Sequence, residues 1–138
     1  MLVKITHTVC AIFLAFSVAA CALHTIPDCQ SGEEEALQDS LYFGTGKTDG
    51  FVTQSEWDEF LESTVTPRFP KGLTVTSATG QWQGADGLIV KEPSYVLTLV
   101  HSGDSTSERA IEDIIQTYKR QFQQEAVLRV KLKVCVSH

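Results

Sequence analysis

The chain has few basic residues and no apolar segment long enough to span a bilayer. Its 138 residues include 11 Lys and Arg against 17 Asp and Glu, which gives a net charge of −6. A nucleic-acid partner needs a concentrated basic surface, so this acidic balance argues against one. The run of apolar and small residues at 9–20 is shorter than the ~20 residues of a transmembrane helix. We therefore expect neither nucleic-acid binding nor a membrane-spanning helix.

The sequence also lacks the recurrent motifs of metal and cofactor sites. The segment GTGKTDG at 44–50 contains glycines and Lys47, but not the spacing of a phosphate-binding loop. His101 has no second His or Cys at a spacing typical of metal ligands. No metal or cofactor is therefore expected, and 44–50 is interpreted as a flexible connection.

The N-terminus has the pattern of a bacterial lipoprotein signal. Lys4 precedes the apolar run at 9–20, which has the length of a signal-peptide core. The run ends in VAAC at 18–21, an aliphatic residue and two small ones before a Cys, as in a lipobox. We predict that 1–20 is a signal peptide and that Cys21 is acylated, with palmitate-type chains as the membrane anchor. The alternative is ordinary cleavage that leaves Cys21 unmodified.

The residues after Cys21 suggest a destination and a domain boundary. In enterobacteria-like sorting, a residue other than Asp after the lipidated Cys favours the outer membrane, and here that residue is Ala22. The sequence therefore predicts a cell-envelope lipoprotein that faces the periplasm. Residues 21–37 are polar, with an acidic run at 33–35, and are predicted to be a tether. Residues 38–138 suit a single domain.

Cys29 and Cys135 are the only other cysteines of the exported chain, because Cys10 lies in the signal peptide. Thiols pair in an oxidising compartment, so a disulfide between Cys29 and Cys135 is one hypothesis. The alternative is a buried thiol at Cys135 and an exposed one at Cys29. The residues alone leave both open.

Hydrophobic periodicity predicts two helices and four strands. A capping box at Thr53 and Glu56 starts a helix that extends to about residue 65. An apolar stripe with helical spacing marks a second helix at about 107–124. Strands are expected at 40–44, 73–82, 95–101 and 126–136, with 88–90 as an extension that Pro93 interrupts.

The last predicted strand alternates apolar and basic residues. Arg129, Lys131 and Lys133 share one face with Cys135, and the apolar residues share the other. The basic row is interpreted as a solvated face or a protected strand edge. An anion site on the open side of the sheet is the alternative.

The order strand, helix, strand, strand, helix, strand predicts an α+β, ferredoxin-like βαββαβ fold. In this fold the last strand lies antiparallel beside the first, and two helices cover one face of a four-stranded antiparallel sheet. The other face is then solvated, buried by a second copy, or used as a site.

Several stretches of the sequence resemble a known family. They are LYFG at 41–44, EWDEF at 56–60, TPRFP at 66–70, GLT at 72–74, GQW at 80–82, KEPS at 91–94, YKRQF at 118–122 and QEAVL at 124–128. Together they resemble domain-of-unknown-function family 3574, a group of bacterial secreted or lipid-anchored proteins, over about 38–137. The resemblance implies an exported single domain and assigns no activity. The ending Val136-Ser137-His138 departs from the aromatic ending expected, so His138 inherits no role.

These features favour a non-enzymatic domain that binds a ligand or partner, and no catalytic residue is assigned. The candidate binding residues are Arg68, Trp82, Glu92, Tyr95 and His101. The alternative is a small cofactor-independent enzyme resembling the dimeric ferredoxin-like monooxygenases, with Glu92, Tyr95 and His101 as its candidate groups. The expected partners are the membrane, through the anchor, and an envelope protein or a second copy of the chain.

Overall fold

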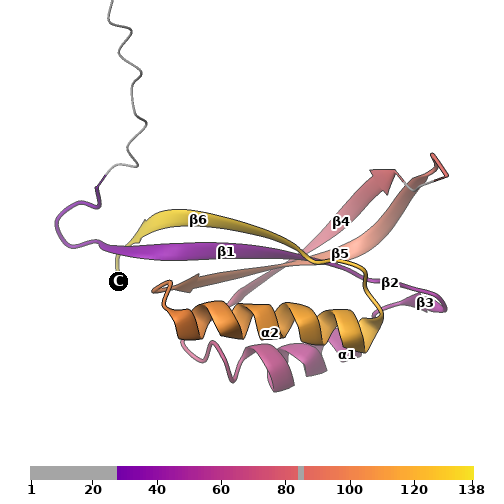
Figure 1. The fold of residues 1–138 in the computed structure, drawn as a ribbon, viewed down its shortest axis with the longest axis horizontal. Helices are drawn as coiled ribbons and strands as arrows, with labels where there is room; N and C mark the ends of the chain where they lie inside the picture. The colour runs from indigo at the N-terminus through magenta and orange to yellow at the C-terminus, as the bar shows by residue number, and fades with distance from the viewer. Residues whose placement is uncertain (1–27, 84–85) are drawn as a thin grey trace, which may run out of the picture.

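A four-stranded antiparallel sheet with helices on one face forms the domain (Figure 1). The computed structural model describes residues 28–83 and 86–138, so the predicted signal peptide and Cys21 lie outside the described residues. The sheet strands are β1 (Glu34–Gly44), β4 (Thr74–Gln83), β5 (Ile89–His101) and β6 (Leu128–Val136). Their spatial order is β4-β5-β1-β6 with every neighbouring pair antiparallel. This order confirms the predicted ferredoxin-like fold.

Two capped helices cover the sheet. Helix α1 (Gln54–Phe60) begins at the predicted capping box, in which Thr53 and Glu56 bond to each other's backbone N–H groups. It continues into a π-helical turn, η1 (Leu61–Val65). Helix α2 (Ser105–Phe122) begins earlier than predicted because the Asp104 carboxylate accepts hydrogen bonds from the first backbone N–H groups. Neither described helix is long and apolar enough to cross a membrane.

The hydrophobic core lies between the helices and one face of the sheet. Leu41 and Phe43 of β1 and Leu97 and Leu99 of β5 point into it and are fully buried. Aromatic rings from both helices surround Phe43, with ring centroids 4.6–6.0 Å away: Trp57, Phe60 and Tyr118. The ring of Tyr118 is buried and its hydroxyl donates to the carbonyl of Gly44 at 2.8 Å. Burial raises the pKa of this hydroxyl, so it stays neutral.

Strand β1 starts inside the segment predicted to be a tether. Residues 34–42 pair with β6, and residues 37–44 pair with β5. The acidic residues Glu34 and Glu35 are exposed at the end of the strand, where their charge remains in solvent. The polar composition of this segment therefore predicted the start of the domain too late in the sequence. Backbone pairing with β6, which begins at Glu34, sets the start of the first strand.

Strand β5 passes through Pro93 without a break, contrary to the sequence prediction. Gly44, the last residue of β1, pairs with Ser94, so Pro93 lies just beyond the end of β1. On its other side Pro93 is paired with Thr79 of β4. Because no residue of β1 lies opposite Pro93, the missing proline N–H does not deprive any carbonyl of β1 of a hydrogen bond. The Pro93 carbonyl accepts a 2.6 Å hydrogen bond from the Thr45 hydroxyl.

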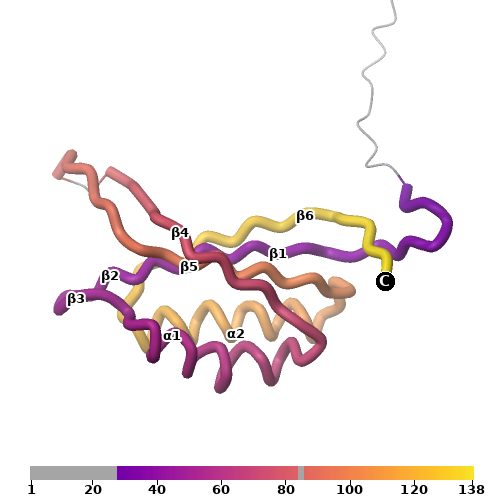
Figure 2. Tube along the Cα trace, turned by 180° about the vertical axis from the view of Figure 1, so that it is seen from behind, coloured from indigo at the N-terminus to yellow at the C-terminus, as the bar shows by residue number. Residues whose placement is uncertain are grey.

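The predicted flexible loop at 44–50 is a small hairpin. Strands β2 (Gly46–Lys47) and β3 (Gly50–Phe51) pair antiparallel. Gly50 has a φ of 136°, a conformation that side-chain-bearing residues rarely adopt. The hairpin projects beyond the end of β1, and the far part of β4 and β5 diverges from it (Figures 1 and 2).

Strand β6 presents its apolar side to the open face of the sheet, not to the core. Leu128, Val130 and Leu132 are exposed there. Arg129 and Lys131 lie on the helix side, where both pair with Glu108 of α2. The alternative of an anion site on the open side is therefore wrong for these two residues, whereas β6 does lie at an edge of the sheet, as the strand-edge interpretation requires. Acidic partners on the helix side account for the orientation.

Candidate functional site

An open groove of about 1100 Å³ lies on the side of the sheet that the helices leave uncovered. Its walls come from the arm, which we define as residues 79–83 of β4 and 89–93 of β5, from the β2–β3 hairpin, and from residues 123–128. The arm extends past the end of β1 and rises away from the helices (Figures 1 and 2). The groove therefore forms where the sheet curves and β1 stops.

Aromatic side chains from three strands line this groove. Tyr42 comes from β1, Phe51 from β3 and Trp82 from β4, and all three are exposed. Val90, Val96 and Leu128 add further apolar surface to the lining. Exposed aromatic and apolar groups that converge on a concave surface are typical of ligand sites.

Glu92 supplies a partly buried carboxylate to the groove. Its Oε2 accepts a 2.6 Å hydrogen bond from the backbone N–H of Gly46. No residue of the described chain donates a hydrogen bond to Oε1. Oε1 is therefore available to accept a hydrogen bond from a ligand.

Two glycines leave the space that the Glu92 carboxylate occupies. A Cβ at Gly46 would lie 2.6 Å from Glu92 Oε2, and a Cβ at Gly44 would meet Glu92 Oε1 even more closely. A Cβ at Gly80, on the neighbouring strand, would make only ordinary contacts. The spacing Gly44-x-Gly46 is therefore a requirement of the site, because any larger residue would displace Glu92.

Polar contacts fix the hairpin against the rest of the fold. Gln124 donates to the Gly46 carbonyl at 2.5 Å, and Lys47 pairs with Glu56 of α1 at 3.0 Å. The backbone N–H of Thr53, followed by Lys47, lowers the pKa of Glu56 to about 2, so its charge persists at neutral pH. The position of Gly46, and with it that of Glu92, therefore depends on three elements.

The residues predicted from sequence divide between two sides of the sheet. Trp82 and Glu92 line the groove, as the binding hypothesis requires. Tyr95 lies on the helix side, where its ring stacks on Trp57 with centroids 4.3 Å apart and its hydroxyl donates to Gln54. Arg68 donates to the carbonyl of Thr64 at 2.6 Å, close to the end of η1. Neither Arg68 nor Tyr95 contributes to the groove.

Sequence analysis missed Tyr42 and Phe51. The signal for Tyr42 was present, since it alternates with Leu41 and Phe43 and therefore points away from the core. Phe51 carried no comparable signal, because its position depends on the fold of the hairpin.

His101 belongs to a buried polar network on the helix side. Its Nδ1 accepts from the backbone N–H of Gly103 at 3.0 Å, so Nε2 carries the proton and donates to Asp39 at 2.7 Å. Arg129 donates to both Asp39 oxygens, at 2.6 and 2.9 Å. Burial opposes ionisation of Asp39, but the bonds from Arg129 and His101 outweigh it and lower its pKa. The network thus holds a charged carboxylate inside the fold.

This network does not have the character of a metal site. Asp39, His101 and Glu108 do bring ligand-type atoms within 4.8 Å of one another. However, Arg129 already donates to Asp39 and Glu108, and Lys131 to Glu108. A guanidinium on the same oxygens would repel a cation, so we interpret the network as structural.

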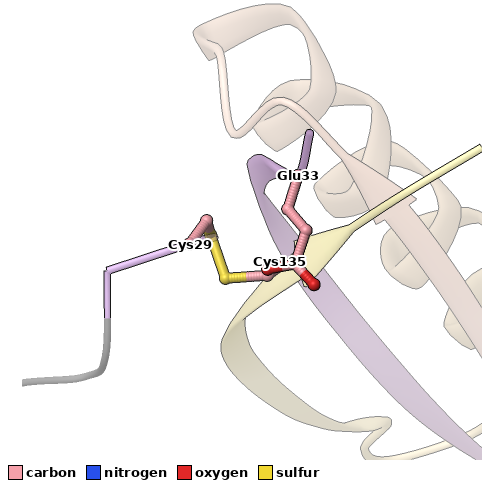
Figure 3. Close-up of side chains that lie close together, drawn as sticks. All are labelled: Cys29, Glu33 and Cys135. Carbon is pink, nitrogen blue, oxygen red and sulfur yellow. A yellow bond between two sulfur atoms is a disulfide. The ribbon is translucent and has the colours of Figure 1, made fainter. Parts of the chain in front are cut away.

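A disulfide joins Cys29 to Cys135 across 106 positions of the sequence, with the two Cα atoms 5.4 Å apart. It links the segment before β1 to the end of β6, and Glu33 lies beside it (Figure 3). Because each sulfur is bonded to the other, neither is a thiolate that would bind a metal. The cluster therefore acts as a covalent clasp between the two ends of the domain.

The chain belongs to the family described as "Protein of unknown function (DUF3574)", which matches residues 38–138. This confirms the resemblance noted in the sequence. No curated protein matches the chain.

Two solved structures show the same fold at low identity. A phage SAM lyase in complex with S-methyl-5'-thioadenosine is 11% identical, with 83% of this chain and 96% of that chain covered and a TM-score of 0.56. CutA from Synechococcus elongatus PCC7942 is 13% identical, with 76% and 83% covered and a TM-score of 0.52. At these identities the similarity concerns the fold alone.

Proposed function

We propose that the protein is a non-enzymatic binding domain whose groove holds a small molecule with an aromatic body and a cationic, hydrogen-bond-donating group. The observation that carries this proposal is Glu92 Oε1, an acceptor without a donor among the described residues, in an aromatic-lined groove of about 1100 Å³. A groove of this size slightly exceeds the usual range of small-molecule sites, about 300 to 1,000 Å³, and therefore has room for a ligand with an aromatic body.

Charge and shape favour that class of ligand. A partly buried carboxylate is stabilised by a cation or a strong donor, because it gives up part of its hydration. The faces of Tyr42 and Trp82 offer flat apolar surface and attract cations in their own right. An aromatic amine satisfies both kinds of group at once.

The enzyme alternative receives less support from the geometry. It requires Glu92, Tyr95 and His101 to act on one substrate. Tyr95 and His101 lie on the helix side of β5, whereas Glu92 lies on the groove side. The three groups do not converge, and a groove that is open along its length excludes water poorly.

Binding of phenethylamine, measured by calorimetry or ligand-observed NMR, tests the proposal. Phenethyl alcohol serves as the matched ligand without a cation. We expect phenethylamine to bind more tightly, and both Trp82→Ala and Glu92→Gln to weaken it by about tenfold. Leu88→Ala is the control variant, because Leu88 is in the exposed β4–β5 connection outside the groove lining. Equal binding of the amine and the alcohol, or no effect of Glu92→Gln, would contradict the role of Glu92.

We further propose that the domain is exported and held on the outer membrane by lipid on Cys21. The signal pattern at 1–21 supports this, and the disulfide suits an oxidising compartment. Mass spectrometry of the N-terminal peptide should find Cys21 acylated, and Cys21→Ser should move the protein out of the membrane fraction. An unmodified N-terminal Cys21 peptide would overturn the anchor.

A further inference from the structure

Strand β5 has an interior edge with which no strand of the described chain pairs. Residues 94–101 of β5 lie between β4 and β1, whereas residues 89–93 pair with β4 alone, because β1 ends at Gly44 opposite Ser94. The outer edges of β4 and β6 are also unpaired in the described chain, as at the border of any open sheet. The edge at 89–93 differs, because it continues the position of β1 into the groove.

The backbone groups of Lys91 face this edge. The Pro93 carbonyl accepts a hydrogen bond from the hydroxyl of Thr45, which follows β1 directly. In an antiparallel ladder a residue directs its N–H and C=O to one edge, and the next residue directs them to the opposite edge. Lys91 therefore directs both groups to the same side as Pro93, and so does Ile89. No strand of the described chain supplies partners for them there.

We propose that the groove binds the N-terminal segment of an extended peptide, which adds to the edge of β5 in line with β1. This inference rests on the proposed function, because it uses the same groove and carboxylate, and it specifies the small molecule as a short peptide. A strand edge with free N–H and C=O groups binds an extended peptide by strand addition, in which main-chain hydrogen bonds supply the affinity.

Charge complementarity sets the direction of the peptide. A strand in line with β1 runs antiparallel to β5, so its N-terminus lies next to Gly44 and its chain continues towards Ile89. Glu92 Oε1 lies at that point, since a Cβ at Gly44 would meet it. The terminal ammonium then matches the Glu92 carboxylate. The reverse direction would instead bring the C-terminal carboxylate of a peptide to a like charge.

The register of such a strand assigns a contact to each peptide residue. If the pairing between β1 and β5 continues beyond its last pair, the first peptide residue lies opposite Glu92, the second opposite Lys91 and the third opposite Val90. The second residue exchanges two backbone hydrogen bonds with Lys91. The side chain of the third residue lies on the groove side, where Val90 is paired with Trp82.

Calorimetric titration of the purified full chain with the amide of Phe-Ala-Val-Ala tests the inference. The N-terminal phenylalanine contains the phenethylamine group, so the peptide keeps the features of the proposed ligand and adds a backbone. We expect the peptide to bind at least about tenfold more tightly than phenethylamine, because it gains main-chain hydrogen bonds.

Two N-methylated forms of the peptide form a matched pair. A methyl group on the nitrogen of the second residue removes the donor to the Lys91 carbonyl, and should weaken binding about tenfold. The nitrogen of the third residue points away from β5, so a methyl group there should weaken binding less than about threefold.

A pair of protein variants probes the same hydrogen bonds from the other side. Lys91→Pro removes the backbone donor at the edge, whereas Lys91→Ala removes the same side chain and keeps the N–H. Because the N–H of Lys91 points away from β4, proline there is compatible with the β4–β5 pairing. Lys91→Pro should bind the peptide about tenfold more weakly than Lys91→Ala. If Lys91→Pro does not fold, the N-methylated pair decides the question on the wild-type chain.

The outcomes separate this inference from the proposed function. If phenethylamine binds and the two N-methylated peptides have equal affinities, the peptide inference is overturned and the proposed function stands. If neither phenethylamine nor the peptide binds, both are overturned. A chain that sediments as an oligomer and binds no peptide would assign the edge to a second copy, which also overturns the inference. Binding of phenethylamine together with selective loss on methylation of the second residue supports it.

Discussion

Asp39 is a fully buried carboxylate and Glu92 a partly buried one, and of the two only Asp39 has its charge matched by protein side chains. Arg129 and His101 satisfy Asp39, whereas the described residues give Glu92 a single backbone N–H. A matched buried charge supports the fold, and an incompletely matched one in a groove marks a binding site. This contrast separates the structural carboxylate from the functional one.

Asp39→Ala should destabilise the domain by about 3 kcal/mol, because it leaves Arg129 and His101 without their buried partner. Urea denaturation measures the loss. Glu59→Ala, an exposed carboxylate on α1, is the control and should have little effect. A loss below about 1 kcal/mol for Asp39→Ala would show that the network contributes little.

Stability should fall in acid because folding lowers several carboxyl pKa values. The Ser102 hydroxyl, followed by the backbone N–H of Ser107, lowers the pKa of Asp104 to about 2, and Glu56 reaches the same value. The unfolded chain therefore begins to bind more protons than the folded one as the pH falls below about 5.5. The melting temperature should be constant above about pH 6 and decline between about pH 5 and pH 2. Asp39→Asn should make this decline less steep, and an unchanged slope would contradict the role given to Asp39.

Gly44→Ala should weaken binding of phenethylamine by about tenfold, since the added Cβ displaces the Glu92 carboxylate. Leu88→Ala is the control, because Leu88 is exposed and lies outside the groove lining. It should leave binding within about twofold of wild type. Equal affinities of the two variants would show that the position of Glu92 is not decisive.

At the scale of elements, features that depend on residues close in sequence could be predicted, whereas features that depend on contacts between distant residues could not. The capping box fixed the start of α1 because its groups lie three residues apart. The alternation in β6 identified a strand but not which side faces the helices. That side depends on the Asp39–Arg129 pair, which joins residues 90 positions apart. Similarly, Trp82 and Glu92 were predicted as binding residues, while Phe51 depended on an unpredicted hairpin.

The disulfide should account for a large part of the stability of β1 and β6. It closes a loop of 106 residues, which corresponds to about 4 to 5 kcal/mol in the chain-entropy model. The double variant Cys29→Ser, Cys135→Ser should unfold at correspondingly lower urea, and a reductant should bring the wild type to the same midpoint. A reductant that shifts the double variant as well would point to a different cause.

At the scale of the whole molecule, the two sides of the sheet have separate roles. The helix side holds the core and the Asp39 network, and the open side holds the groove at one end of β1. The disulfide lies near the other end of β1, where the chain enters the domain. A lipid anchor at Cys21 would thus connect to the domain next to the clasp, at the end of β1 opposite the groove.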